Sequence, residues 1–247
     1  LPDEYSEDYK LWKNVGWALR TADNNYGLQG RLFLTYLKFS SRSDKFKYEE
    51  IQNLYNDWRF KSKTDGKILT ERSIFYWARN SNKVAFEKIQ KNSIEHYINL
   101  SFKSDGSDWD LGCVLHQLYK DRFVLAGFKH NIWYQFVGNC WEESDSGVEL
   151  SREISLELYN VYHDKTVEMV QIMSGLENDK DEWKDYQHKV TISSNICNKL
   201  KNNNSKKNIM QQCKELFYDK EFFDLVDRNI DLLCCSNGVI KIGRAHV

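Results

Sequence analysis

Three aspartates, Asp105, Asp108 and Asp110, lie close together in the segment "DGSDWD". A pair of carboxylates two positions apart on a strand can hold Mg²⁺ ions for nucleotidyl transfer or nuclease chemistry. Here the pair lies at the start of a predicted helix over residues 109–122, where acidic side chains favour the helix dipole and act as caps. We therefore predict capping. A nuclease would instead require Mg²⁺-dependent cleavage that is lost on Asp108→Ala.

Cys113 and His116 form an i, i+3 pair in the same predicted helix, and such a pair can contribute to a zinc site. No second pair follows at zinc-finger spacing, so we predict that Cys113 is a core cysteine. The chain has 6 cysteines without a C-x-x-C pair, which favours a reduced intracellular compartment over a disulfide framework. Cys140 lies in a turn, and no basic partner is evident for it as a nucleophile.

Motifs of nucleotide and hydrolase chemistry are missing from the chain. A P-loop needs G-x-x-x-x-G-K-[ST], but Gly66-Lys67 precedes Ile68 and has no glycine five residues before it. Neither G-x-S-x-G nor H-E-x-x-H occurs. The sequence therefore predicts no catalytic, cofactor-binding or metal-binding residue in this segment.

Composition restricts the class of protein. The chain has 247 residues, 41% hydrophobic and 14% aromatic, with a net charge of −1, and this is enough for one large domain or two small ones. Its pI near 6.7 argues against a protein whose main task is to coat nucleic acid, although a local basic face is compatible with it. No apolar run reaches the ~18–20 residues that span a bilayer, and no signal peptide is visible.

The segment "YKDRFVLAGFKHNIWYQFVGNCWEESDSG", residues 119–147, is the most strongly patterned part of the chain. Alternation predicts strands over 123–128, 133–138 and 139–144, with turns at "KHN" and "GN". It places Trp133 and Tyr134 on opposite faces, so one aromatic set should be core. We predict core packing for most of these rings, because a half-buried sheet must pack one face on its flanking helices.

Basic residues border this predicted sheet. Lys120, Arg122 and Lys129 are candidate nucleic-acid contacts, since exposed aromatics stack bases and basic neighbours attract phosphate. We predict an exposed loop over residues 201–208, "KNNNSKKN". We interpret a second basic cluster, which lies in and next to this segment, as a solvated loop; its members are Lys199, Lys201, Lys206 and Lys207.

The remaining pattern predicts a mainly α fold with a small antiparallel β-hairpin element (α+β), built from two helical units. Helical periods recur over 6–22, 29–40, 47–58 and 69–80, with Ser6 and Thr70 as predicted N-caps and 63–68 as a turn. A connecting helix is predicted over 82–103. Further helices follow over 148–230, before an apolar, strand-like run ending near Ile240.

The hairpin segment resembles the domain that precedes the superfamily III helicase in viral primase-helicases, above all those of large nucleocytoplasmic DNA viruses and poxvirus-like enzymes. That domain has D-R-[FY]-V followed by a W-[YVL]-x-[FW]-x-G-x-x-W hairpin, and an N-G-V strand near its end. The matching residues are Asp121, Arg122, Phe123, Val124, Trp133, Tyr134, Phe136, Gly138, Trp141, Asn237, Gly238 and Val239.

The N-terminal part resembles the primase C-terminal helical domain. The matching residues are Tyr9, Trp12, Val15, Gly16, Ala18, Leu19, Phe39, Ser40, Arg42, Ser43, Trp58, Ser73, Ile74, Trp77 and Ala78. The resemblance implies a non-catalytic middle segment that couples primase to helicase in viral DNA replication. It also implies that ATP, Mg²⁺ and the catalytic motifs belong to flanking domains, that the parent protein is a DNA-binding homo-hexamer, and that it acts at a replication site in host cytoplasm or nucleus.

Four segments are expected from this resemblance: a primase C-terminal-type domain (1–81), a connecting helix (82–104), a helicase-preceding domain (105–241) and a tail (242–247). The tail "IGRAHV" resembles a translated sequencing adapter, and both ends look truncated. The alternative is a stand-alone α-rich adaptor that binds protein or nucleic acid. A Walker A motif encoded downstream would distinguish the two.

Overall fold

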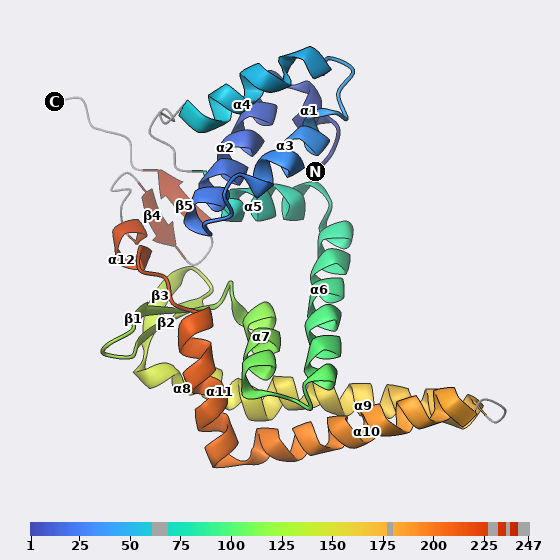
Figure 1. Cartoon of the computed structure of the whole chain (residues 1–247). Coiled ribbons are helices and arrows are strands. Elements are labelled where there is room, and N and C mark those ends of the chain that lie inside the picture. Colours follow the sequence, from blue (N-terminus) through green and yellow to red (C-terminus); the bar gives the residue numbers. More distant parts are fainter. Residues whose placement is uncertain (61–68, 177–179, 227–231, 236–237, 242–247) are drawn as a thin grey trace. The chain divides into compact units, whose positions relative to one another are not determined.

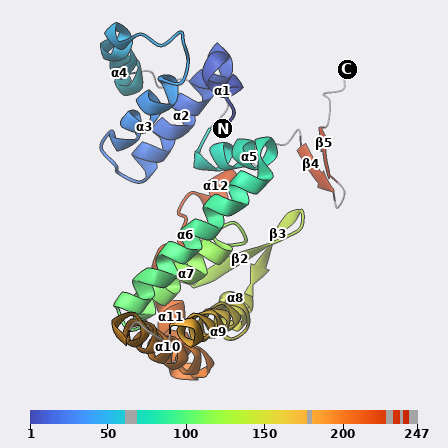
Figure 2. The same cartoon turned by 90° about the vertical axis from the view of Figure 1, so that its right-hand side faces the viewer.

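The computed structural model is mainly α-helical and carries a small antiparallel sheet, which confirms the predicted fold class (Figures 1 and 2). It describes residues 1–60, 69–176, 180–226, 232–235 and 238–241. The chain divides into two units, Leu1–Gln90 and Lys91–Val247. The division falls within helix α6 (Lys83–Lys103), and each unit is considered by itself. Across the described ranges, no helix has both the length and the apolar character needed to cross a bilayer.

Unit 1 is helical throughout its described part. In chain order it contains α1 (Glu4–Glu7), α2 (Tyr9–Asn25), α3 (Arg31–Ser40), η1 (Tyr48–Glu50), α4 (Ile51–Phe60), α5 (Glu71–Ser81) and the first part of α6. Its buried core joins α2, α3 and α4 through Val15, Ala18, Ala22, Phe33, Tyr36 and Trp58. A buried carboxylate completes the junction between α2 and α3: Asp23 accepts the N–H groups of Gly30 at 2.6 Å and Leu32 at 2.9 Å.

The two N-caps predicted in unit 1 have different outcomes. Thr70 does precede α5, and its N–H donates to Ser73 Oγ at 3.2 Å. Ser6 is not the cap of the first long helix: it lies buried inside α1 and donates to the Asp3 carbonyl at 2.8 Å. Asp8 is the cap, because its extended backbone lets its carboxylate accept the Leu11 N–H at 2.9 Å. The predicted turn over 63–68 lies outside the described residues.

Unit 2 surrounds the small sheet with helices. After α6 it contains α7 (Asp108–Tyr119), β1 (Phe123–Gly127), β2 (Ile132–Val137), β3 (Cys140–Ser144), η2 (Asp145–Gly147), α8 (Val148–Glu153), η3 (Ile154–Leu158), α9 (Tyr159–Gly175), α10 (Lys180–Lys201), α11 (Asn203–Leu216), α12 (Phe222–Leu225), β4 (Leu232–Cys235) and β5 (Gly238–Lys241). Helices α9 and α10 lie side by side as a long helical hairpin in both views (Figures 1 and 2). Strands β4 and β5 form a hairpin of their own.

A continuous core holds unit 2 together. It combines α7, the sheet and the helices that follow, and its fully buried members include Leu111, Leu115, Phe123, Leu125, Trp133, Leu150, Ile154, Leu158, Tyr162, Ile196 and Leu200. Tyr162 keeps its hydroxyl satisfied inside this core through a 2.6 Å hydrogen bond with Ser101. A buried polar tip without such a partner would cost free energy, so this bond lets the ring reach the centre.

The sheet has the predicted order and antiparallel pairing, β1-β2-β3. Val137 pairs with Cys140 across a two-residue turn in which Gly138 has φ +72°, the conformation that such a tight hairpin turn requires. Beyond β1, Leu125 donates its N–H to the Phe217 carbonyl at 2.9 Å and accepts from Asp219 at 3.1 Å. The chain that follows α11 therefore covers the outer edge of the sheet.

The aromatic rings divide between the two faces of the sheet as the alternation predicts. Trp133 belongs to the main core and has no exposed surface, whereas Tyr134 and Trp141 pack with buried Phe222 in a smaller cluster. The prediction of core packing holds in part: Phe123 and Trp133 are buried, Tyr134 and Trp141 are half-buried, and Phe128 and Phe136 are 43% and 37% exposed.

The predicted loop over 201–208 is wrong. Only Asn202 separates α10 from α11, and its side-chain oxygen accepts the N–H groups of Asn204 at 2.9 Å and Ser205 at 3.2 Å. The run of asparagines and lysines has modest helix propensity on its own. Burial of Ile209 and Cys213 further along α11 holds the segment helical, so tertiary packing overrides local preference.

Candidate nucleic-acid interface

The three predicted contact residues do not form one cluster. Lys120 and Arg122 precede β1, whereas Lys129 follows it, and five extended residues span roughly 17 Å. Lys120 donates to Gln117 at 3.1 Å. Arg122 lies over the rings of Tyr119 and Phe123, at 6.0 Å and 5.5 Å from their centroids.

Arg122 is also tied to the sheet. With its amide oriented so that both groups are satisfied, Gln135 accepts from Arg122 Nε at 3.1 Å and Nη2 at 2.8 Å. The guanidinium is therefore held in place by its neighbours. Arg122 and Lys129 are both exposed, and Lys120 is half-buried.

Buried Trp133 positions the turn that carries Lys129. Its indole Nε1 donates to Asn131 Oδ1 at 3.0 Å, and Asn131 has a left-handed backbone with φ +56°. Because Trp133 itself cannot move within the packed core, this bond fixes the side chain of Asn131 at the end of the β1–β2 turn. The aromatic hairpin thus serves as a scaffold for a polar loop.

The same indole positions a second loop. Gly147, with φ +72°, passes so close to Trp133 that an added Cβ would lie 3.1 Å from the indole Cδ2 and 3.2 Å from Met210 Cε. Ser146 immediately before it also has a positive φ, of 54°. Only glycine suits a position that is both left-handed and in contact with a buried ring. The "DSG" sequence at the start of α8 is explained by this contact.

These two loops face one side of α11 across a hollow of about 340 Å³. Its lining is polar and basic: Asn131, Ser146, Ser151, Asn203, Lys206, Lys207, Met210, Gln211 and Lys214. The α11 residues recur at steps of three and four, so they share one helix face. The opposite face of α11 carries Ile209 and Cys213 into the core beside α7. We call this feature the basic hollow.

The lining of the basic hollow carries three lysines. Among the residues that the structure describes, no carboxylate lines it, and Lys206, Lys207 and Lys214 form no ion pair. Amide and hydroxyl donors share the lining with the ammonium groups. Such a lining matches phosphate oxygens, which accept hydrogen bonds from lysine, asparagine and serine side chains.

The other two lysines of the predicted solvated loop have structural partners. Lys199 Nζ lies 2.8 Å from Asp108 Oδ1 and donates to the Gly106 carbonyl at 2.7 Å. Lys201 donates to the Ser155 carbonyl at 2.6 Å, and its ammonium lies 3.9 Å from the centroid of the Tyr159 ring. The interpretation of this cluster as a loop is therefore wrong: Lys199 and Lys201 anchor α10, while Lys206 and Lys207 line the basic hollow.

The acidic segment before α7 takes part in this anchoring. Asp108 faces Lys199, and Asp110 accepts from the Ser107 hydroxyl at 2.6 Å. Ser107, whose oxygen accepts the Asp110 N–H at 3.2 Å, is the N-cap of α7, so the predicted capping by an aspartate is corrected to capping by the serine beside it. Asp108 and Asp110 occupy the first turn, where they favour the helix dipole.

Cys113 and His116 lie on the buried side of α7. Burial raises the pKa of the Cys113 thiol, with Asp110 adding to the effect. Burial also lowers the pKa of His116 to about 4, and the nearby Lys120 contributes in the same direction. Its ring meets Phe217 edge to face at 4.8 Å between centroids. Within the described part of the chain, no group of three or more His, Cys, Asp or Glu side chains is arranged to hold a metal ion.

Two family models match this chain, one after the other along the sequence. The family model described as "Primase C terminal 2" matches residues 1–78, and the model described as "D5 N terminal like" matches residues 113–244, which is more than half of the chain. The chain therefore belongs to the D5 N-terminal-like family. The pair of matches in this order marks it as a member of the viral primase-helicase group.

Similar proteins come from several large DNA viruses. A putative helicase of Acanthamoeba polyphaga mimivirus is 25% identical over 236 residues, covering 95% of this chain and 23% of that protein. A putative helicase of Frog virus 3 is 25% identical over 275 residues, covering 97% and 26%. A putative primase of African swine fever virus is 24% identical over 258 residues, covering 98% and 26%. The chain spans about a quarter of the length of these curated relatives.

Proposed function

We propose that this chain is the central, non-catalytic segment of a DNA primase-helicase that acts in viral DNA replication, where it couples a primase to a superfamily III helicase. The order of the two family matches within one chain carries this proposal. The named relatives are putative helicases and primases about four times as long, so most of each relative lies outside the matched segment. ATP and Mg²⁺ would serve those flanking domains, in a homo-hexamer at an intracellular replication site.

Within this role, the basic hollow is the part of unit 2 that contacts the DNA backbone. Support comes from its three lysines, its polar donors and the lack of a lining carboxylate in the described part of the chain. Phosphate contacts of this kind bind DNA without regard to sequence, which suits a segment that must hold a moving strand. Lys129 lies on the β1–β2 turn two residues before Asn131, so it is a candidate for a further phosphate contact beside the hollow.

Salt-dependent binding of single-stranded DNA tests the basic hollow. Fluorescence anisotropy of a labelled 20-mer, titrated between 50 and 200 mM NaCl, gives the slope of log K against log salt. Each phosphate contact on single-stranded DNA contributes about −0.7 to this slope, so Lys206→Gln/Lys207→Gln should make it shallower by about 1.4.

A matched control is Lys88→Gln/Lys91→Gln, which removes two exposed charges from α6, outside the hollow. This control should leave the slope nearly unchanged. If both double variants change the slope equally, the basic hollow does not contact DNA.

The genomic sequence around this segment tests the coupling role. The coding sequence that continues downstream should encode G-x-x-x-x-G-K-[ST] within the next domain, of the usual 100–200 residues. Stop codons directly on both sides would instead identify a stand-alone adaptor.

A further inference from the structure

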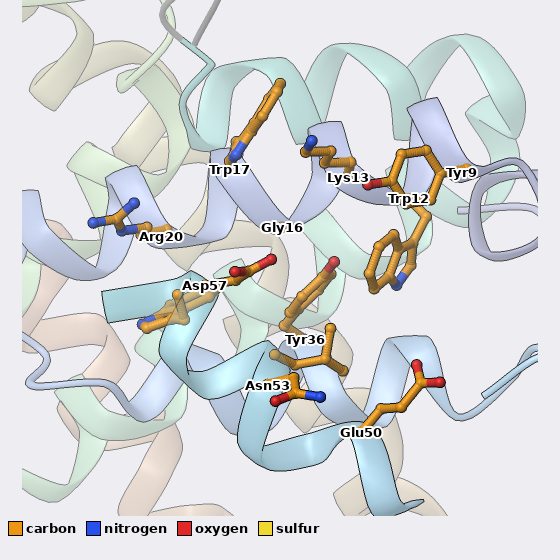
Figure 3. A pocket seen from close by; sticks show the side chains of 12 residues that line it. Tyr9, Trp12, Lys13, Gly16, Trp17, Arg20, Tyr36, Glu50, Asn53 and Asp57 are labelled. Atoms are coloured by element: carbon orange, nitrogen blue, oxygen red, sulfur yellow. The ribbon is translucent and has the colours of Figure 1, made fainter. Parts of the chain in front are cut away.

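Unit 1 contains a second hollow, a groove of about 260 Å³ between α2 and α4 (Figure 3). We call it the aromatic groove. Side chains of α2 form one rim, and side chains of η1 and α4 form the other. The lining residues are Tyr9, Trp12, Lys13, Gly16, Trp17, Arg20, Tyr36, Glu50, Asn53, Leu54, Asp57 and Trp58. The volume is below that of pockets for drug-sized ligands and suits one flat ring system.

The floor of the aromatic groove is a row of stacked rings. Trp12 stacks on Tyr36 with 5.3 Å between centroids, and Tyr36 stacks on Trp58 at 6.0 Å. Gly16 allows this arrangement, because a Cβ at that position would lie 2.6 Å from Tyr36 Cζ. The Trp12 indole N–H is already used by Ser40 Oγ at 2.7 Å. Tyr36 and Trp58 are buried and make the floor rigid, so the half-buried Trp12 and the exposed Tyr9 are the ring surfaces open to a ligand.

The two rims carry opposite chemistry. On α2, the Lys13 ammonium lies 5.4 Å from the centroid of the Tyr9 ring and 5.0 Å from that of Trp17, so the cation sits beside one exposed and one half-buried ring. The opposite rim offers acceptor oxygens from Glu50, Asn53 and Asp57, which project toward the groove (Figure 3). A matching ligand needs a flat ring, a hydrogen-bond donor edge and an anionic tail on the far side.

A nucleotide of single-stranded DNA has all three features. Its base stacks on aromatic side chains, its phosphate pairs with a lysine, and the amino groups of adenine, cytosine and guanine donate to acceptor oxygens. Thymine has no amino group: two carbonyls flank its single N3–H donor, and these carbonyl oxygens would face the carboxylate oxygens of the same rim. A basic peptide side chain fits less well, because Lys13 lies at the same rim and would repel a second cation.

We infer that the aromatic groove binds one unpaired base of single-stranded DNA and prefers an amino-bearing base to thymine. The base lies against the rings of the groove, its amino edge faces Asn53 and Asp57, and its phosphate faces Lys13. This site is separate from the basic hollow, which reads phosphate alone. The two sites therefore differ in a measurable way: only the groove discriminates among bases.

The test is anisotropy of labelled (dA)12, (dC)12 and (dT)12 with the full 247-residue chain at constant salt. We expect (dA)12 and (dC)12 to bind about fivefold more tightly than (dT)12, the effect of one discriminating hydrogen bond. Asn53→Ala/Asp57→Ala should abolish this preference. The control Glu49→Ala/Gln52→Ala changes exposed residues of the same segment outside the groove and should preserve it.

Stacking is tested by Tyr9→Ala, which should weaken binding of all three oligonucleotides by about fivefold or more. Its control is Tyr48→Ala, because Tyr9 and Tyr48 are 68% and 74% exposed and either can be removed without opening the core. Lys206→Gln/Lys207→Gln should lower every affinity equally and keep the base preference, so failure of the hollow and failure of the groove are distinguishable. Equal affinity for all three oligonucleotides, or equal effects of Tyr9→Ala and Tyr48→Ala, would overturn the inference and leave the groove to a peptide.

Discussion

Substitution of Gly147 tests whether the contact with Trp133 holds the hairpin scaffold together. Gly147 and Gly138 have the same φ of +72°, but their surroundings differ. A Cβ at Gly147 would press against the buried indole at 3.1 Å, whereas a Cβ at Gly138 would meet nothing within 4 Å. Gly138→Ala is therefore a matched control that carries the same backbone strain without the steric contact.

The two magnitudes follow from separate costs. Alanine in the left-handed region costs about 1 kcal/mol at either position. Overpacking against a rigid core adds about 2 kcal/mol at Gly147 alone. The unfolded-state entropy that alanine removes is common to both variants and cancels in their difference. We expect Gly138→Ala to lower the free energy of unfolding by about 1 kcal/mol and Gly147→Ala by about 3 kcal/mol.

Urea unfolding followed by circular dichroism measures this difference. Both glycines belong to unit 2, so a separate transition of unit 1 would serve as an internal reference. Gly147→Ala should also weaken DNA binding, because Ser146 at the rim of the basic hollow depends on the same turn. If the two variants lose the same stability within about 0.5 kcal/mol, the error expected for independent sites, the indole does not hold this loop and the scaffold argument fails.

Two further predictions concern buried titratable groups. Between pH 7 and pH 4 the unfolded chain protonates His116, whereas burial keeps the folded imidazole neutral down to a pKa of about 4. As the pH falls over this range, the free energy of unfolding should therefore decrease by about 3 kcal/mol more in the wild type than in His116→Gln. Urea unfolding at each pH measures this, and an equal decrease in both proteins would contradict it. Burial also raises the pKa of the Cys213 thiol. A thiol reagent at pH 8 should therefore label the exposed Cys140 and Cys234 in the native protein, but Cys213 only after unfolding. Rapid labelling of Cys213 in the native protein would contradict its place in the core.

Local sequence signals determined most of the secondary structure. Alternation separated Trp133 from Tyr134 across the sheet, the Gly138-Asn139 pair marked the tight turn, and Thr70 marked the start of α5. These signals are readable because strand alternation, turn conformation and helix capping each depend on a few consecutive residues. Two predictions from the sequence were wrong. Ser6 was predicted as an N-cap although nearby Asp8 caps the helix, and residues 201–208 were predicted as a loop although core packing makes most of them part of α11.

Tertiary structure alone decided where the candidate sites lie. Asn131 and Lys214 are far apart in sequence, and they share the basic hollow only because Ile209 and Cys213 seat α11 in the core while Trp133 fixes the turn opposite. The aromatic groove likewise depends on packing between separate helices. Side-chain types and local periodicity can be read from the sequence. Which charged residues from distant parts of the chain lie close together depends on which apolar faces are buried against each other.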